Sequence, residues 1–308
     1  MAKRRKQRKR GKQASYASTI TFLVLVAVIA WFFQDNQPGD SKKATTQQSA
    51  TTTSVGSSSS TVSTESNSVV NTGAVDYGNV DDVHPNESLA SSVLTDTVKA
   101  NLAANAVHFN GTGAFILNND DSDLDPNVSS AMYVNLSPVD NLQRPGVANA
   151  LLTKSARQYK NRVTTGNASK IEPVGWQQLK IGGRYQYLYN RGHSIGYAIA
   201  GSVSGFDASE ANIQNITTQT AWANQASNGD VNNTGQNYYE GLVRKALDQN
   251  KRLRYQVTPV YDGDDLVPAG SHIQAKSTDG TLNFNVFVPN VQPGVAIDYT
   301  NGSAKVVN

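Results

Sequence analysis

An uncharged run close to the N-terminus, preceded by a basic cluster, is the feature that most constrains how this chain can fold. Residues 1–13 contain eight Lys or Arg and no acid, and the 22 residues 13–34 carry no charge. Within that run, residues 20–33 are apolar except for Thr21. A stretch of about 20 such residues is long enough to cross a bilayer. We therefore predict a basic cytoplasmic tail over residues 1–13 and one transmembrane helix over residues 14–34, which leaves the globular fold to the rest.

The end of this run distinguishes an anchor from a cleaved signal peptide. Signal peptidases cut after small residues, whereas the run ends in Trp31, Phe32 and Phe33. Bulky aromatic residues of this kind are typical of a membrane interface. The pattern favours an uncleaved signal anchor in the cell membrane, with a single pass and the C-terminal part outside. A cleaved signal peptide and a secreted protein are the alternative.

Residues 35–75 have the composition of a flexible linker. Between residues 44 and 66, 15 of 23 residues are Ser or Thr, none is aromatic and only Glu65 is charged. Such a segment cannot bury enough apolar surface to offset the entropy lost on ordering. We therefore predict one globular domain over residues 76–308.

The charge and cysteine content of the exported part exclude several classes of protein. The formal net charge of +3 includes the eight N-terminal cations, so residues 14–308 carry −5. Attraction for a polyanion therefore has to come from a local patch and not from the basic overall composition. The chain has no cysteine, which excludes disulfides, thiolate metal sites and a cysteine nucleophile.

Apolar periodicity predicts helices followed by several strands. Helical spacing covers residues 91–102, 145–159 and 239–248, and strand-like runs cover 109–117, 253–261, 282–288 and 294–299. The pairs Asp279-Gly280 and Asn301-Gly302 are typical of tight turns between antiparallel strands. The arrangement predicts an α+β fold with an antiparallel sheet.

An acidic segment, residues 120–125, resembles the start of a calcium-binding loop but lacks its key residues. Pro126 stands where that loop needs glycine, and Met132 where it needs a bidentate glutamate. We interpret this segment as a solvated hairpin loop.

The stretch from Tyr185 to His193 carries the strongest signal for chemistry. It alternates like a strand and ends in Arg191-Gly192-His193. Histidine exchanges a proton near neutral pH, so His193 is the best candidate for a general base. The planar guanidinium of Arg191 suits a phosphate, and Gly192 lets the backbone turn between the two.

A set of amides, one acid and a second arginine follows this histidine: Asn215, Gln219, Asn224, Glu240 and Arg244. No second histidine lies near them. Hard cations such as Mg²⁺ accept oxygen ligands and keep most of their waters, so one amide oxygen and a carboxylate are enough to hold one. A base, a hydrated cation and arginines together suit phosphodiester hydrolysis.

Four motifs in this order resemble the DNA/RNA non-specific endonucleases. They are Asn190-Arg191-Gly192-His193, Asn215-Ile216-x-x-Gln219, Trp222-Ala223-Asn224-Gln225 and Gly235-Gln236-Asn237-Tyr238-Tyr239-Glu240. The resemblance covers residues 90–306 and is strongest for the membrane-bound DNA-entry nucleases of Gram-positive bacteria, which share the N-terminal anchor. It implies the ββα-metal, or His-Me finger, nuclease fold, with a central antiparallel sheet flanked by helices and preceded here by one transmembrane helix. It also implies hydrolysis of DNA, with RNA as a further substrate, using Mg²⁺, for which Mn²⁺ can substitute. DNA uptake, nutrient scavenging and degradation of host DNA stay open as biological roles.

The resemblance also implies roles for individual residues. By position, the general base falls on His193, the single protein ligand of the metal on Asn224, and the acid that holds metal-bound water on Glu240. Arginines that face the phosphate fall on Arg191, which also counts among the catalytic residues, and on Arg244. A plainer alternative for Glu240 and Arg244 is an ordinary salt bridge along a helix.

Further residues are implied to support the site or to bind the substrate. Asn190, Asn215 and Gln219 resemble amides that support the site, although the family's motif usually begins with Asp where this chain has Asn190. We expect that change to alter hydrogen bonding or electrostatics around His193. Lys245 begins a basic run, continued by Lys251, Arg252 and Arg254, that suits a DNA backbone or is a solvated face.

Two other functions fit parts of the same sequence. A DNA receptor that has this fold and has lost catalysis is one, because fold does not guarantee activity and Asn190 departs from the motif. The other is a serine esterase, since Gly192-His193-Ser194-Ile195-Gly196 fits the nucleophile elbow. That elbow needs a helix directly after Ser194 and a parallel sheet, whereas the strands predicted here are antiparallel.

Overall fold

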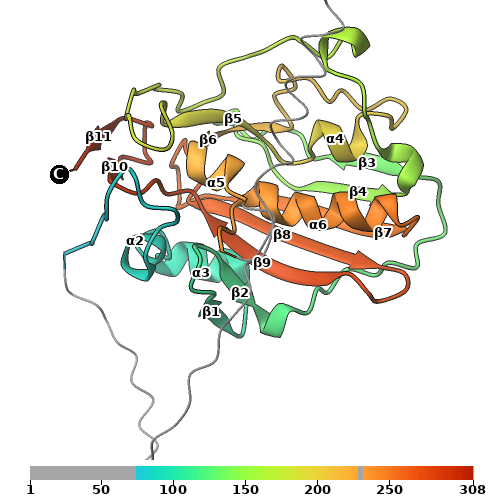
Figure 1. The fold of residues 1–308 in the computed structure, drawn as a ribbon, viewed down its shortest axis with the longest axis horizontal. Coiled ribbons are helices and arrows are strands. Elements are labelled where there is room, and N and C mark those ends of the chain that lie inside the picture. The colour runs from blue at the N-terminus through green and yellow to red at the C-terminus, as the bar shows by residue number, and fades with distance from the viewer. Residues whose placement is uncertain (1–73, 228–231, 308) are drawn as a thin grey trace, which may run out of the picture. The chain divides into compact units, whose positions relative to one another are not determined.

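A seven-stranded sheet is the largest element of the computed structural model, which describes residues 74–227 and 232–307 (Figure 1). Every pair of neighbours in it is antiparallel. In the order of the sheet, the strands are β1 (Val107–Phe109), β2 (Phe115–Leu117), β9 (Asn283–Pro289), β8 (Gly270–Ser277), β7 (Leu253–Val260), β4 (Ala148–Leu152) and β3 (Tyr133–Leu136). The predicted α+β class with an antiparallel sheet is confirmed.

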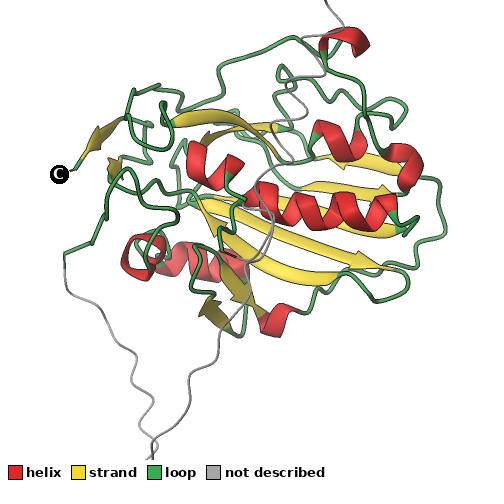
Figure 2. Cartoon of the chain, viewed as in Figure 1, coloured by secondary structure: helices red, strands yellow, loops and turns green. Residues whose placement is uncertain are grey.

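The helices are short apart from one, α6, which lies along the sheet (Figure 2). The α-helices of the described part are α2 (Glu87–Ser91), α3 (Asp96–Leu102), α4 (Tyr197–Ala200), α5 (Ala221–Gln225) and α6 (Gln236–Asp248). Single 3₁₀ turns are η1 (Asn118–Asp120), η2 (Lys154–Ala156) and η3 (Val163–Thr165).

The packing of α6 on the sheet follows from two matching periodicities. Tyr239, Val243 and Leu247 recur every four residues along the helix, and all three are buried. In β7 the alternate residues Leu253 and Tyr255 are buried in the same apolar cluster. A helix with one apolar stripe and a strand with one apolar face bury each other's surface in this way. The predicted helix over residues 239–248 is confirmed and begins three residues earlier.

A separate two-stranded sheet carries the histidine motif. In it β5 (Tyr189–His193) pairs antiparallel with β6 (Ile216–Thr220), and α5 begins at the next residue. Thr220 starts that helix, because its Oγ1 accepts a hydrogen bond from the Ala223 amide at 3.1 Å. The helix contacts both strands, and α6 contacts α5 and α4. Two strands followed by a helix are consistent with the implied ββα motif.

The C-terminal residues form a second small hairpin. In it β10 (Val295–Ile297) pairs with β11 (Ala304–Val306), and the predicted Asn301-Gly302 turn lies between them. The predicted Asp279-Gly280 turn lies likewise between β8 and β9.

Several predicted elements are wrong in type or extent. The helix predicted over 145–159 is strand β4 followed by the turn η2, because β4 pairs with a neighbour on each side and its burial overrides the helical preference of Ala and Leu. The helix predicted over 91–102 is two helices, since Thr95 caps a new one by accepting a hydrogen bond from Val98 N. The single strand predicted over 109–117 is the β1–β2 hairpin. Strand β8 was missed by the sequence patterns.

The predicted N-terminal segments lie outside the part of the chain that is described. Residues 1–73 contain the predicted tail and membrane anchor and most of the predicted linker. Among residues 74–227 and 232–307, no helix is both long and apolar enough to span a membrane.

Candidate active site

One cleft of about 300 Å³ collects polar side chains from four separate parts of the chain. His193 lies at the end of β5, Asn224 lies in α5 and Glu240 lies in α6. Arg162 immediately precedes η3. The wall between them is made by Gly196, Tyr197, Ala198, Gln225 and Asn237. Three of the four residues were predicted site residues, and the fourth, Arg162, was not.

His193 is held at the end of its hairpin by a buried amide. The Asn215 side chain donates to Ile195 O at 3.0 Å and accepts from Ile195 N at 2.9 Å, while Ser194 N donates to Asn215 O. These three bonds lock the turn that follows the histidine. Gly192 is required here, because a Cβ at that position would lie 2.0 Å from Gln219 Oε1. The side chain of His193 is therefore placed by β5 and by the loop before β6 together.

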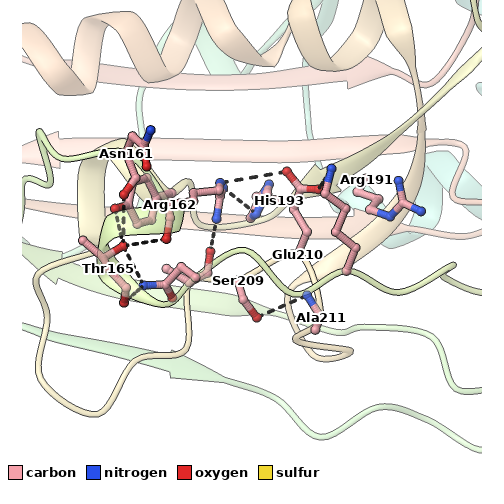
Figure 3. A network of polar contacts seen from close by, with 12 residues as sticks. Asn161, Arg162, Thr165, Arg191, His193, Ser209, Glu210 and Ala211 are labelled. Carbon is pink, nitrogen blue, oxygen red and sulfur yellow. Dashed lines mark hydrogen bonds and ion pairs between the residues drawn. The ribbon is translucent and has the colours of Figure 1, made fainter.

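Arg162 binds the imidazole of His193 directly. Its Nη2 lies 2.9 Å from His193 Nε2, and the same guanidinium donates to Ala208 O and lies over the Tyr197 ring at 4.5 Å (Figure 3). Arginine only donates, so Nε2 holds the lone pair and the neutral ring carries its proton on Nδ1. Burial, together with the positive charge of Arg162, lowers the pKa of His193 from 6.5 to about 3. His193 is therefore neutral at physiological pH, the form that a general base requires.

The carboxylate of Glu240 lies against the same cleft with little room around it. Its oxygens lie 3.5 Å from Arg244 Nη1 and 3.4 Å from Gln236 Nε2. Burial raises the pKa of Glu240, and the neighbouring Arg244, Gln236 and Arg162 oppose that rise. A Cβ on Gly196 would lie 2.7 Å from the carboxylate, so the absence of a side chain at residue 196 makes space for Glu240.

The side chain of Asn224 is available to bind a metal ion. It lines the cleft, and its side chain makes no hydrogen bond to any other described residue. The helix that carries it is anchored, because Thr220 N donates to Asn290 Oδ1 at 2.7 Å and Trp222 N donates to Gln292 Oε1 at 3.0 Å. The amide oxygen is thus on a fixed helix and is not engaged by the protein.

The donor set in the cleft fits a hard divalent cation. No group of three or more His, Cys, Asp or Glu that could hold a metal exists within the described ranges. A metal in this cleft would take one amide oxygen from Asn224 and reach Glu240 directly or through water. Oxygen donors with most positions left to water match the preference of Mg²⁺.

A buried relay of amides joins the hairpin to α6. Gln219 donates to Gln236 Oε1 at 3.0 Å, and Gln236 donates to His193 O and to Glu240 Oε1. Asn190 lies directly across the hairpin from Gln219. The Asn190 Nδ2 and Gln219 Oε1 atoms are both buried without a hydrogen-bond partner. The position where the family motif usually has Asp is therefore neutral and incompletely satisfied in this chain.

Comparison with known proteins agrees with this geometry. The model of the DNA/RNA non-specific endonuclease family matches residues 111–306, which is more than half of the chain. The chain belongs to this family. The crystal structure of NucA from Streptococcus agalactiae with no metal bound has a TM-score of 0.62 and 42% sequence identity, and covers 70% of this chain and 99% of its own. The same protein with a magnesium ion bound has a TM-score of 0.62 and 44% identity, and covers 69% of this chain and 98% of its own.

Membership of the non-specific endonucleases establishes the class of reaction. The chain is a metal-dependent endonuclease, a hydrolase of phosphodiester bonds. The nucleophile elbow of the esterase alternative is wrong for this fold. Ser194 is 3% exposed and does not line the cleft, the strand that precedes it belongs to an antiparallel pair, and α4 begins only at Tyr197.

The other predicted site residues of this endonuclease lie around the cleft and not in it. Arg191 stacks over Trp176 at 4.7 Å and donates to Ile171 O, so its side chain extends away from Arg162 (Figure 3). Arg244 is bound to Glu240 and to Asn237 Oδ1, the latter at 2.9 Å. Lys245 is exposed on α6. The assignment of these three residues to substrate binding stays a prediction.

The continuation of the basic run beyond Lys245 is largely engaged within the protein. Lys251 pairs with Asp279 at 3.0 Å, Arg252 donates to Val128 O and Arg254 donates to Asn149 Oδ1. The acidic loop contributes a further ion pair, Asp121 with Lys276 at 3.1 Å. Arg254 thus links β7 to β4, and the other groups hold loops to the ends of β7 and β8.

Two site residues escaped the sequence patterns. Arg162 lies in a polar loop 31 residues before His193, where no periodicity or motif marks it. Gln236 was quoted only as part of a motif, although it contacts both His193 and Glu240. The one signal that pointed toward Arg162 is the surplus of cations in its loop.

Replacing Arg162 by glutamine is expected to raise the pKa of His193. The guanidinium lowers that pKa by charge, so its removal shifts the value upward from about 3 towards the ordinary 6.5. The measurement is an NMR titration of the histidine Cε1–H signals in the metal-free protein. Lys160→Gln, a neighbouring exposed cation, is the control and should leave the signal of His193 unchanged. An unchanged pKa in Arg162→Gln would show that burial alone keeps His193 neutral.

Proposed function

We propose that this chain is a Mg²⁺-dependent endonuclease of low sequence specificity that cleaves DNA and also accepts RNA. Mn²⁺ is proposed as a substitute metal. The observation that supports the proposal is the meeting of His193, Asn224, Glu240 and Arg162 in one cleft. These residues combine a neutral base, an oxygen donor for a cation, a carboxylate and a permanently charged guanidinium.

The protein groups have separable tasks in this proposal. His193 accepts the proton of the attacking water, for which its neutral state is required. Arg162 has to leave the imidazole first, since a guanidinium bound to Nε2 occupies its lone pair. A phosphate in the cleft offers that guanidinium a charged acceptor and a bidentate geometry, which an imidazole does not. Arrival of the substrate would in this way release the base and neutralise the phosphate together.

The metal would be held by Asn224, with Glu240 orienting bound water. When bound there, Mg²⁺ supplies stabilisation of the negative charge that develops on the phosphate and the leaving oxygen. Gln236 holds Glu240 relative to His193 through one amide, which fixes the carboxylate and the base in a common frame. Asn215 and Gln219 support that frame from the hairpin.

We further propose that the N-terminal segment anchors the enzyme in the cell membrane, with the nuclease domain outside, and that DNA uptake is a candidate role. The support is the basic tail, the uncharged run and the Ser/Thr-rich linker of the sequence. A secreted form after cleavage is the alternative.

The test of the proposed function is cleavage of supercoiled plasmid by the purified full chain. We expect nicked and linear products with Mg²⁺ and none with EDTA, and restored cleavage when Mg²⁺ or Mn²⁺ is added in excess. Plasmids of unrelated sequence should be cut at similar rates. A chain that binds plasmid without cutting it under any of these conditions would support the DNA-receptor alternative. Asn190→Asp would then show whether one carboxylate restores cleavage.

A further inference from the structure

A basic segment with an exposed aromatic residue borders the cleft. Residues 154–170 contain five Lys or Arg and no acid, although residues 14–308 as a whole carry −5. Within the described residues, two of the large apolar side chains with the greatest exposure lie on this segment, Tyr159 at 68% and Val163 at 74%. Three of these cations have acidic partners from elsewhere in the chain: Arg157 pairs with Asp248, and Arg162 and Lys170 pair with Glu210. Lys154 and Lys160 have no described ion pair, and cations interleaved with exposed aromatic surface are typical of a nucleic-acid contact.

The Tyr159 side chain is exposed and yet held in place. Its hydroxyl donates to Asp248 Oδ1 at 2.7 Å, and the Arg157 guanidinium lies over its ring, 4.8 Å from the centroid. Arg157 is itself fixed, since it binds Asp248 at 3.2 Å and donates to Ala198 O, and its side chain is 9% exposed. One face of the ring is thus covered by a cation, and the exposure of the residue leaves the other to solvent. A free surface tyrosine would have neither constraint.

The segment around Tyr159 is attached to the wall of the cleft. Gln158 N donates to Ala198 O, and the Tyr197 hydroxyl donates to Lys160 O at 2.9 Å. Ala198 and Tyr197 both line the cleft, and Arg162 follows three residues after Tyr159. A strand whose phosphate lies at Arg162 therefore has Tyr159 beside its path.

We propose that Tyr159 is a stacking platform for a base of the substrate strand next to the phosphate being cleaved. This proposal rests on the proposed nuclease function and refines its substrate to a strand whose base next to the cleaved phosphate is unstacked. Every base has a π-face, so stacking adds affinity without reading sequence, which matches low specificity. Arg157 on the far face pre-positions the ring, so little side-chain entropy is lost on binding.

The test distinguishes base stacking on the Tyr159 ring from electrostatic attraction to the neighbouring cations. The full chain carrying His193→Ala, in EDTA, is titrated against a fluorescent single-stranded oligonucleotide and against a strand of the same length made of abasic nucleotides. Tyr159→Ala is expected to weaken binding of the ordinary strand about five- to tenfold, the lower part of the range for base–aromatic stacking, and to leave binding of the abasic strand unchanged. Tyr159→Phe, which keeps the ring and loses the bond to Asp248, should stay within about twofold of the parent.

Tyr187→Ala removes a second exposed tyrosine, which lies outside the basic segment 154–170; it is the matched control and should change neither affinity. If Tyr159→Ala lost affinity equally for both strands, or for neither, the proposed stacking on Tyr159 would be wrong. Failure of the proposed function is a different result, the absence of cleavage by the wild-type chain, and the binding comparison does not depend on it.

Discussion

Replacing His193 by alanine is expected to lower the rate of DNA cleavage by about 10²- to 10⁴-fold, the usual contribution of a positioned general base. His193 is the one histidine that lines the cleft within the described residues, and its low pKa keeps it neutral, so that it can accept a proton once Arg162 has left Nε2. No other group in the cleft can replace it, because Glu240 is engaged by Arg244 and Gln236. The measurement is the initial rate of plasmid nicking in saturating Mg²⁺.

Two comparisons distinguish a lost base from a lost fold. His108→Ala removes an exposed histidine on β1 and should leave the rate unchanged. Added imidazole should restore part of the cleavage in His193→Ala, because a small base can enter the space that the side chain leaves. Full activity in His193→Ala would show that the proton leaves water by another route, and the assignment of the base would be wrong.

Replacing Asn224 by alanine is expected to lower cleavage by at least about 100-fold at Mg²⁺ concentrations that saturate the parent chain. A bound metal contributes several kcal/mol to a phosphoryl transition state, and Asn224 is a cleft amide on α5 whose side chain makes no hydrogen bond to another described residue. Because the loss acts through the metal, higher Mg²⁺ should recover part of the rate. Initial rates over a Mg²⁺ titration measure both effects.

The neighbouring residue provides a matched control for the metal ligand. Gln225→Ala removes the other α5 amide that lines the cleft and, if Asn224 is the ligand, should leave the Mg²⁺ dependence unchanged. Asn224→Asp keeps an oxygen donor and should bind Mg²⁺ more tightly than Asn224→Ala does. If all three variants showed the Mg²⁺ dependence of the parent, the ligand would have to be sought elsewhere in the cleft.

The sequence was most informative where function constrains short motifs. His193, Asn224 and Glu240 could be named because each lies in a recognisable motif, and the order of those motifs pointed to the family. The long helix α6 could be predicted because its apolar stripe repeats over three turns. The antiparallel class could be predicted from tight turns, whose residues act locally.

Predictions from the sequence were wrong where burial in the fold outweighs the local secondary-structure preference of the residues. In β4 the apolar residues Ala150 and Leu151 are adjacent, so no alternation reveals a strand that is buried on both faces. Paired strands on both sides then decide its conformation, and those neighbours are distant in the chain. The position of the Arg191 side chain could not be predicted for the same reason. Trp176 and Ile171, which contact it, belong to a loop distant in the sequence.

The sequence by itself determined the family, the order of the site motifs and the chemical types in them. Only the tertiary structure decided that Arg162 binds His193, that Gln236 connects the base to Glu240, and that Tyr159 is held by Asp248. Local patterns report the preferences of neighbouring residues, whereas these contacts join segments 31 to 89 residues apart. Such contacts arise from the packing of α4, α5 and α6 between the hairpin and the sheet, which no short window of sequence contains.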